Sequence, residues 1–289
     1  ESLQSVKDVI GTKQNITTAL KNSIIKELPK EPFGILLSGG VDSSIIAKIC
    51  KDENAPFRCF CVGIEGSEDL KVAKEIARLL ELKLVFKEFE LDEVEKLLMK
   101  IIDILPRPII QDDNYIEYMV KVSVSTVLLA AISLGDEKIF YSGIGAEELF
   151  AGYQRHVKSV SEGGMWRGIA IKELEEESWD GLKRLNNLVI SRDKLISESV
   201  TQEIISPYID DELIILAMSL STDEKIDLVT NKKMLREIAK DIGVPREAYD
   251  RKKKGAQYGS SFDKAITKLA KRNGFKLKKR YLNSIISKK

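Results

Sequence analysis

Residues 33–44 read Phe-Gly-Ile-Leu-Leu-Ser-Gly-Gly-Val-Asp-Ser-Ser, and a helix-like apolar run follows them directly. The stretch 33–37 predicts a buried strand and the stretch 43–51 predicts a helix. Between them, Gly39 and Gly40 allow positive φ and let the backbone come close to an anion. Serine hydroxyls and the free N–H groups of a helix start supply donors in a field that favours negative charge. The stretch therefore predicts a polyphosphate-binding loop.

Asp42 is the unusual residue of this loop, because a carboxylate repels phosphate oxygens. A divalent cation between the two removes that repulsion, and Mg²⁺ commonly bridges one or two carboxylates to phosphates. The loop therefore predicts Mg²⁺ together with a nucleotide. The alternative is a glycine-rich turn in which Asp42 only caps the helix.

Composition sets broad limits on the class of protein. The chain has 289 residues, 43% of them hydrophobic and 31% charged, which is enough for a sizeable core. No uncharged apolar run approaches the ~20 residues that cross a bilayer, and the N-terminus has no signal-peptide pattern. The three cysteines, Cys50, Cys59 and Cys61, cannot all pair. With no disulfide framework indicated, we expect a cytoplasmic protein that does not enter a membrane.

Charge is distributed unevenly along the chain, although its net value is +1. Residues 251–289 hold fourteen Lys and Arg against one acid, Asp263, for a net +13, and the rest of the chain is therefore at −12. A basic tail can face RNA. It can equally be a solvated helix face or a segment folded back on the acidic body.

Strand and helix patterns alternate through the first half of the chain. We expect strands over 33–37, 57–63, 84–86 and 138–141, and helices over 15–28, 43–51, 68–80, 91–104 and 115–134. This alternation predicts an α/β fold with a doubly wound parallel sheet, in which ligands bind at the carboxyl ends of the strands.

Strand patterns nearly vanish after residue 157, where helical periods dominate over 182–189, 211–219 and 232–241. We therefore expect an α/β nucleotide-binding lobe at residues 1–156 and a helical lobe, with the basic C-terminal segment, at residues 157–289.

Three further segments carry chemistry. Residues 142–153, Ser-Gly-Ile-Gly-Ala-Glu-Glu-Leu-Phe-Ala-Gly-Tyr, again place a glycine turn and acids after a strand. Glu147 and Glu148 either cap a helix or share a metal with Asp42. Residues 206–210, Ser-Pro-Tyr-Ile-Asp, favour a turn and a helix N-cap. Residues 251–260 form a basic loop with glycines, which either neutralises a triphosphate or is solvated or faces RNA.

Together these segments resemble the synthetase domain of asparagine synthetases, within the N-type ATP pyrophosphatase superfamily. The first loop is equally similar to those of GMP, NAD and argininosuccinate synthetases, and the motif at 142–153 narrows the resemblance. Residues 207–210, 233–237 and 251–260 also look like that group, so the resemblance runs from about residue 15 to 262. It implies a HUP-type (adenine nucleotide alpha hydrolase-like) fold with a C-terminal helical lobe.

The resemblance also implies a set of site residues. ATP pyrophosphate would be bound by Leu37, Ser38, Gly39, Gly40, Asp42, Ser43 and Ser44, and the adenosine would be bordered by Val62, Ser142 and Gly143. Asp42 and Glu147 would hold Mg²⁺, and Lys253 would stabilise the adenylation transition state. The implied enzyme is an ATP- and Mg²⁺-dependent amide ligase that adenylates a carboxylate and then admits ammonia or an amine.

The chain departs from the family pattern in three places. Ile144 stands where a glutamate usually helps to receive the amine, and an apolar residue cannot accept a proton. Lys121 is the nearest substitute for an arginine in the aspartate-binding region. No amidotransferase domain precedes the motifs, so we expect ammonia from solution or from a separate glutaminase subunit. Two alternatives remain: an RNA-modifying ATP pyrophosphatase, and a nucleotide-binding homologue without synthetase activity.

Two other candidate ligand types are less informative. Cys59 and Cys61 lie on one face of a strand, and we expect them to pack in the core. His156 is the single histidine; it could contact the nucleotide, but we expect a polar surface residue.

Overall fold

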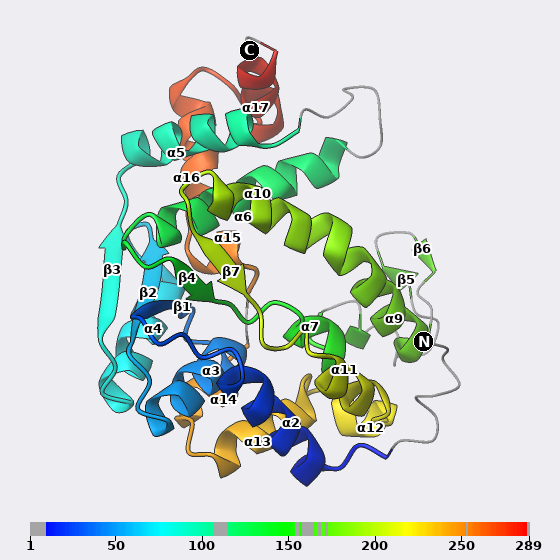
Figure 1. Cartoon of the computed structure of the whole chain (residues 1–289). Helices are drawn as coiled ribbons and strands as arrows, with labels where there is room; N and C mark the ends of the chain where they lie inside the picture. Colours follow the sequence, from blue (N-terminus) through cyan, green and yellow to red (C-terminus); the bar gives the residue numbers. More distant parts are fainter. Residues whose placement is uncertain are drawn as a thin grey trace.

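The computed structural model describes residues 10–106, 115–153, 156–157, 165–166, 169–170, 173–252 and 254–287. At its centre lies a five-stranded sheet in the order β3-β2-β1-β4-β7, with every neighbouring pair parallel (Figure 1). The strands are β1 (Phe33–Leu36), β2 (Phe57–Gly63), β3 (Leu84–Glu88), β4 (Ile139–Tyr141) and β7 (Glu203–Ile205). The predicted α/β fold with a doubly wound parallel sheet is confirmed.

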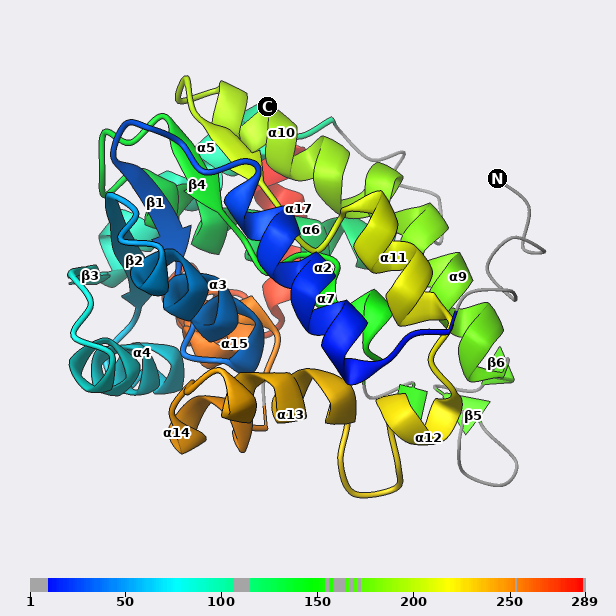
Figure 2. The same cartoon turned by 60° about the horizontal axis from the view of Figure 1, so that its bottom comes forward.

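Helices cover both faces of the sheet because its strands are apolar on both sides. Ile35 and Cys59 point into one core cluster, whereas Phe60 and Phe140 point into the other. The first cluster packs beneath α2 (Lys13–Ile25), α3 (Val41–Asp52), α4 (Glu68–Leu79), α11 (Asp211–Met218), α13 (Lys233–Asp241) and α14 (Arg246–Tyr249). Figure 2 brings α2, α3 and α13 of this face forward.

The second core cluster lies under the opposite helical layer. It contains residues of α5 (Leu91–Ile104), α6 (Tyr115–Ile132), α10 (Ser191–Glu198), α16 (Phe262–Arg272) and α17 (Lys278–Ile286). Short helices complete the chain: α7 (Ala146–Leu149), α12 (Thr222–Lys225) and α15 (Ala256–Gly259). The helix α9 (Leu174–Leu185) runs through a π-helical turn, η1 (Asn186–Ile190), into α10.

The second half of the chain differs from the expectation in one respect. It contributes β7, which extends the sheet beside β4, and a two-residue pair, β5 (Met165–Trp166) and β6 (Ile169–Ala170). These strands are too short to show a period in the sequence. The division into lobes at residue 156 stays a prediction.

The basic C-terminal segment folds back on the body of the molecule. Arg272 reaches Asp92 and Glu95 of α5, with 2.5 Å to the Glu95 carboxylate. The Tyr281 hydroxyl also donates to Glu95, at 2.5 Å, and one face of α17 is buried. Of the three alternatives left open by the charge pattern, the described residues favour this one. None of their helices is both long enough and apolar enough to cross a membrane.

Candidate active site

The predicted phosphate loop connects β1 to the start of α3. Gly39 has φ +72°, and a Cβ there would lie 2.8 Å from the backbone nitrogen of Ala73 in α4, so only glycine fits. The Ser38 N–H donates to the Ser43 hydroxyl at 3.3 Å, which closes the loop. The helix begins at Val41, two residues before the expected start. Asp42 therefore lies in its first turn, 1% exposed.

A buried lysine joins the two acids that the sequence singled out. Lys232 Nζ donates to both carboxylate oxygens of Asp42 at 2.8 Å and to Glu147 Oε1 at 2.8 Å. Lys232 is 2% exposed and precedes α13 with φ +55°, a strained conformation for a lysine. Sequence reasoning missed Lys232, because it placed this residue in an amphipathic helix over 232–241. Asp42 and Glu147 do come together as predicted.

The acid pair fits a magnesium ion. Because both carboxylates bond one nitrogen at 2.8 Å, the bonded oxygens lie no farther apart than twice that distance. Mg²⁺ holds oxygens at about 2.0–2.1 Å and is commonly bound by one or two carboxylates plus substrate phosphates. The two acids could therefore share a Mg²⁺ ion in place of the ammonium group.

Two glycines make room for this cluster. A Cβ on Gly152 would come within 2.0 Å of Glu147 Oε2 and 2.3 Å of Lys232 Cε. A Cβ on Gly143 would come within 2.9 Å of the Asp42 side chain. The glycines of the 142–153 motif thus let the backbone pass directly beside the acids.

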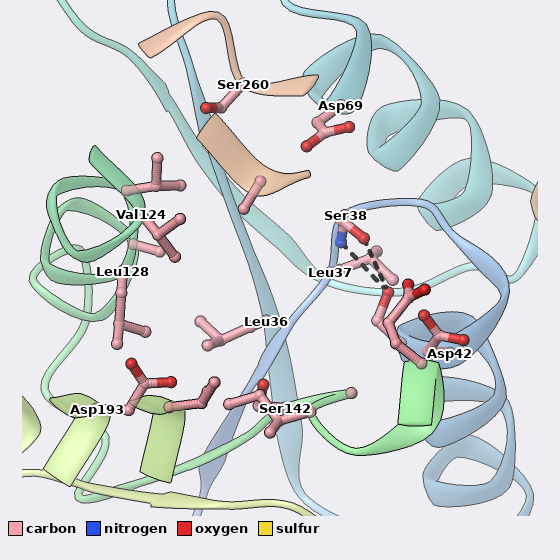
Figure 3. Close-up of a pocket in the computed structure, with 18 of the residues that line it drawn as sticks. Leu36, Leu37, Ser38, Asp42, Asp69, Val124, Leu128, Ser142, Asp193 and Ser260 are labelled. Carbon is pink, nitrogen blue, oxygen red and sulfur yellow. Dashed lines mark hydrogen bonds between the residues drawn. The ribbon is translucent and has the colours of Figure 1, made fainter. Parts of the chain in front are cut away.

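A cavity of about 260 Å³ opens at the carboxyl ends of the strands, next to this cluster (Figure 3). Its size is close to the lower end for ligand pockets, ~300–1,000 Å³. Predicted site residues that line it are Leu37, Ser38, Asp42, Ser43, Val62, Ser142, Gly143 and Glu147. Eight predicted residues that are scattered in sequence therefore face one space.

Other predicted residues do not line the cavity. Gly39 and Gly40 shape the loop behind it, and Ser44 is fully buried, with a hydroxyl that has no hydrogen-bond partner among the described residues. Lys253 lies outside the described residues. Lys121, the suggested substitute for an arginine, is half-buried and is not among the residues that line the cavity.

Two residues from the later motifs hold the loop in place. The Tyr208 hydroxyl donates to the backbone carbonyl of Asp42 at 3.1 Å. Burial, together with the Asp42 charge, raises the pKa of Tyr208 far above its ordinary value, so it stays a donor. Arg251 donates to the Ser38 carbonyl at 2.5 Å and to Asp69 at 2.6 Å. The start of the basic loop therefore lies against the phosphate loop.

The remaining candidates can be placed as well. Ile144 lines the cavity, so the apolar departure from the family pattern lies in the site itself. Cys59 and Cys61 are free and buried, which confirms core packing, and burial raises the pKa of Cys61 to about 12. The surface expectation for His156 is wrong: the ring is fully buried and accepts from the Tyr153 N–H at 3.4 Å.

Comparison with known proteins agrees with these motifs. The asparagine synthase family model matches residues 15–188 and 170–284. A Methanocaldococcus jannaschii protein named "Putative asparagine synthetase (glutamine-hydrolyzing) 1" is 31% identical over 92% of this chain and 53% of its own length. Asparagine synthetase (glutamine-hydrolyzing) 1 of Arabidopsis thaliana is 32% identical over 73% of this chain and 35% of its own length.

The chain thus spans about half or less of the length of these curated relatives. Among solved structures, NMN synthetase from Francisella tularensis covers the whole chain at 12% identity with a TM-score of 0.41, a similarity too low to support an inference. The family match extends over nearly the whole sequence, and the chain belongs to the asparagine synthase family.

Proposed function

We propose that the chain is an ATP- and Mg²⁺-dependent ligase that adenylates a carboxylate and transfers the acyl group to ammonia or an amine. The observation that carries this proposal is the cluster of Asp42, Glu147 and Lys232 at the mouth of the phosphate loop. A neutral ligand would gain little from two acids and one cation placed beside a glycine turn. These groups suit a metal-bound polyphosphate.

In the first step, a carboxylate oxygen of the acceptor attacks the α-phosphorus of ATP. The bond from that phosphorus to the bridging oxygen breaks, and pyrophosphate leaves with the electron pair. In the second step, an uncharged amine attacks the acyl carbon, AMP leaves, and the new amide nitrogen loses a proton. Both steps need negative charge to be neutralised at fixed positions.

Three sets of residues would supply that neutralisation. Asp42 and Glu147 would hold Mg²⁺, which would supply positive charge to the polyphosphate. Because Mg²⁺ would then balance the charge of both acids, the Lys232 ammonium group would be released from them. It would pair with a phosphate oxygen instead. Lys253, two residues after the anchored Arg251 in the sequence, would stabilise the negative charge that develops at the α-phosphate.

The adenosine would lie across the strand ends, bordered by Val62, Ser142 and Gly143, which all line the cavity. Ile144 gives the amine no proton acceptor at its own position, so we expect the amine to react from its uncharged form. We therefore expect the rate of the second step to rise with pH as the neutral fraction of ammonia or amine grows.

Product analysis tests the proposal. The protein is incubated with Mg²⁺, ATP, hydroxylamine as the amine and a mixture of carboxylic acids, and the nucleotide products are separated. We expect AMP and pyrophosphate in equal amounts, together with a hydroxamate, and no signal when either Mg²⁺ or the acids are omitted. ADP and phosphate as the products, or tight ATP binding without turnover for any acid, would contradict the proposal.

A further inference from the structure

The wall of the cavity opposite the phosphate loop is largely apolar, and its charged residues among those described are the paired Arg192 and Asp193. Leu185, the last residue of α9, and Val189 of η1 line this wall, and Ile144 lines the cavity from the turn after β4. In Figure 3, Val124 and Leu128 of α6 lie across the space from Asp42. A π-helical turn is rare and occurs often at functional sites. Here it separates α9 from α10 at the point where this wall is formed.

The described bases at the cavity are already engaged by its acids: Lys232 pairs with Asp42 and Glu147, and Arg251 pairs with Asp69. Among the described residues that line the cavity, the acids are Asp42, Asp69, Glu147, Glu148 and Asp193, and the one base is Arg192. Arg192 is already engaged, because its Nε donates to Asp193 at 2.6 Å and both side chains are nearly buried. Figure 3 shows Asp193 on the side of the cavity that lies opposite Asp42.

These two observations limit which other group the acceptor substrate can carry besides the carboxylate that is activated. Burial raises the pKa of Asp193 even beside Arg192, which indicates that the far end of the cavity is poorly solvated. A second carboxylate on the substrate would be placed among acids and apolar side chains without a free basic partner from the described lining. An unpaired charge in such a place is strongly disfavoured, whereas an apolar group would bury its surface against Leu185 and Val189.

We infer that, given the ligase activity proposed above, the acceptor is a monocarboxylic acid with an uncharged, apolar side chain that packs on Ile144, Leu185 and Val189. Its carboxylate would point to the phosphate loop and its side chain to the π-helical wall. An aspartate-like substrate with a second carboxylate would be discriminated against.

The test is acid-dependent exchange of labelled pyrophosphate into ATP, which reports activation without any amine. Succinate and 4-methylpentanoate form a matched pair, since an isopropyl group replaces one carboxylate at nearly the same shape; aspartate is the third acid. We expect kcat/KM for 4-methylpentanoate to exceed that for succinate and for aspartate by about tenfold or more. Equal values, or a preference for either diacid, would overturn the inference and leave the proposed function standing. Exchange with no acid at all would overturn both.

A charge introduced in the wall gives an independent check. Val189→Lys places a base in the cavity, whereas Asn187→Lys places the same charge on an exposed position of the same π-helical turn. Val189 is half-buried, so a lysine can be accommodated at its position. We expect Val189→Lys to shift the preference towards succinate by about tenfold, and Asn187→Lys to match the unmodified chain. The same preference in both variants would overturn the assignment of this wall to the acceptor.

Discussion

Two buried lysines, seven residues apart in the chain, have opposite surroundings. Lys232 is 2% exposed, and its ammonium group lies between Asp42 and Glu147 at 2.8 Å. Lys225 is 3% exposed, and the contact of its Nζ is the sulfur of Met218 at 3.9 Å. Among the described residues, no carboxylate hydrogen-bonds to Lys225, and burial lowers its pKa to about 8.

The comparison shows that burial alone does not identify a functional lysine. A buried ammonium group with two carboxylates marks a position where positive charge is required, and a divalent cation can compete for it. A buried lysine beside a thioether lowers the stability of the fold. Among the described residues it has no hydrogen-bonded carboxylate that a metal ion could take over. Lys232 is therefore part of the site, and Lys225 belongs to the packing around α12.

The largest expected effect comes from removing one acid of the Lys232 cluster. Asp42→Asn keeps the size of the side chain but removes a metal ligand, and we expect pyrophosphate release to fall about 10³-fold. The measurement is turnover at saturating Mg²⁺ and ATP, with circular dichroism as the check on folding. Asp52→Asn is the matched control, because Asp52 lies on the same helix and pairs at its exposed end with Lys48. Wild-type turnover by Asp42→Asn would show that the metal assignment is wrong.

Removing the lysine should separate its two roles. In Lys232→Met without metal, the buried Asp42 and the half-buried Glu147 face each other with their cation gone, which costs about 3–5 kcal/mol of the free energy of unfolding. Mg²⁺ should recover much of that loss, so the Tm of the variant should rise with added Mg²⁺ more than that of the unmodified chain. Thermal unfolding over a Mg²⁺ titration measures this. Identical Mg²⁺ responses would mean that Lys232 and the metal do not share a position.

For Lys225, the lysine without a hydrogen-bonded carboxylate among the described residues, we expect substitution to change stability alone. The pKa of Lys225 is lowered from 10.5 to about 8 in the folded chain, so between these values the unfolded state binds more protons. Stability should therefore rise with pH through this interval, and the full penalty, about 3 kcal/mol, should be present below pH 8. Lys225→Met should raise the free energy of unfolding at pH 7 by up to that amount and flatten its pH dependence. Urea unfolding at pH 7 and pH 10 checks this; a lower stability of the variant at both values would contradict it.

The smallest effect concerns the support of Asp42. Tyr208→Phe removes the hydrogen bond to the Asp42 carbonyl, and we expect a loss of about 1 kcal/mol of stability. Because the loop loses one of its anchors, kcat/KM for ATP should fall a few-fold with the metal dependence unchanged. Chemical denaturation and steady-state kinetics measure the two quantities. A loss as large as that of Asp42→Asn would mean that Tyr208 acts in the chemistry itself.

Much of this architecture could be predicted from the sequence, since the strands of the first half are apolar runs separated by strong helix patterns. The glycine turns at Gly39 and Gly143 also located the carboxyl edge of the sheet, and with it Asp42 and Glu147. What could not be predicted depends on tertiary contacts. β7, from Glu203 to Ile205, is too short to show a period, and it is a strand only because β4 offers it an edge.

Lys232 could not be found because a lysine at a helix start looks like any solvated residue. The Lys232 side chain reaches Asp42 because α13, which follows it, packs beside α3. His156 was misplaced for the same reason, as a polar residue after a glycine motif gives no sign of complete burial. The basic C-terminal segment left three alternatives open until Arg272 was seen to contact α5.

The most direct test of the central claim is a crystal structure with Mg²⁺ and a non-hydrolysable ATP analogue. We expect Mg²⁺ between Asp42 and Glu147, with oxygens of both at about 2.0–2.1 Å, and Lys232 Nζ moved from the acids to a phosphate oxygen. A structure in which the nucleotide is bound while Lys232 still joins both acids, with the metal elsewhere, would contradict the account.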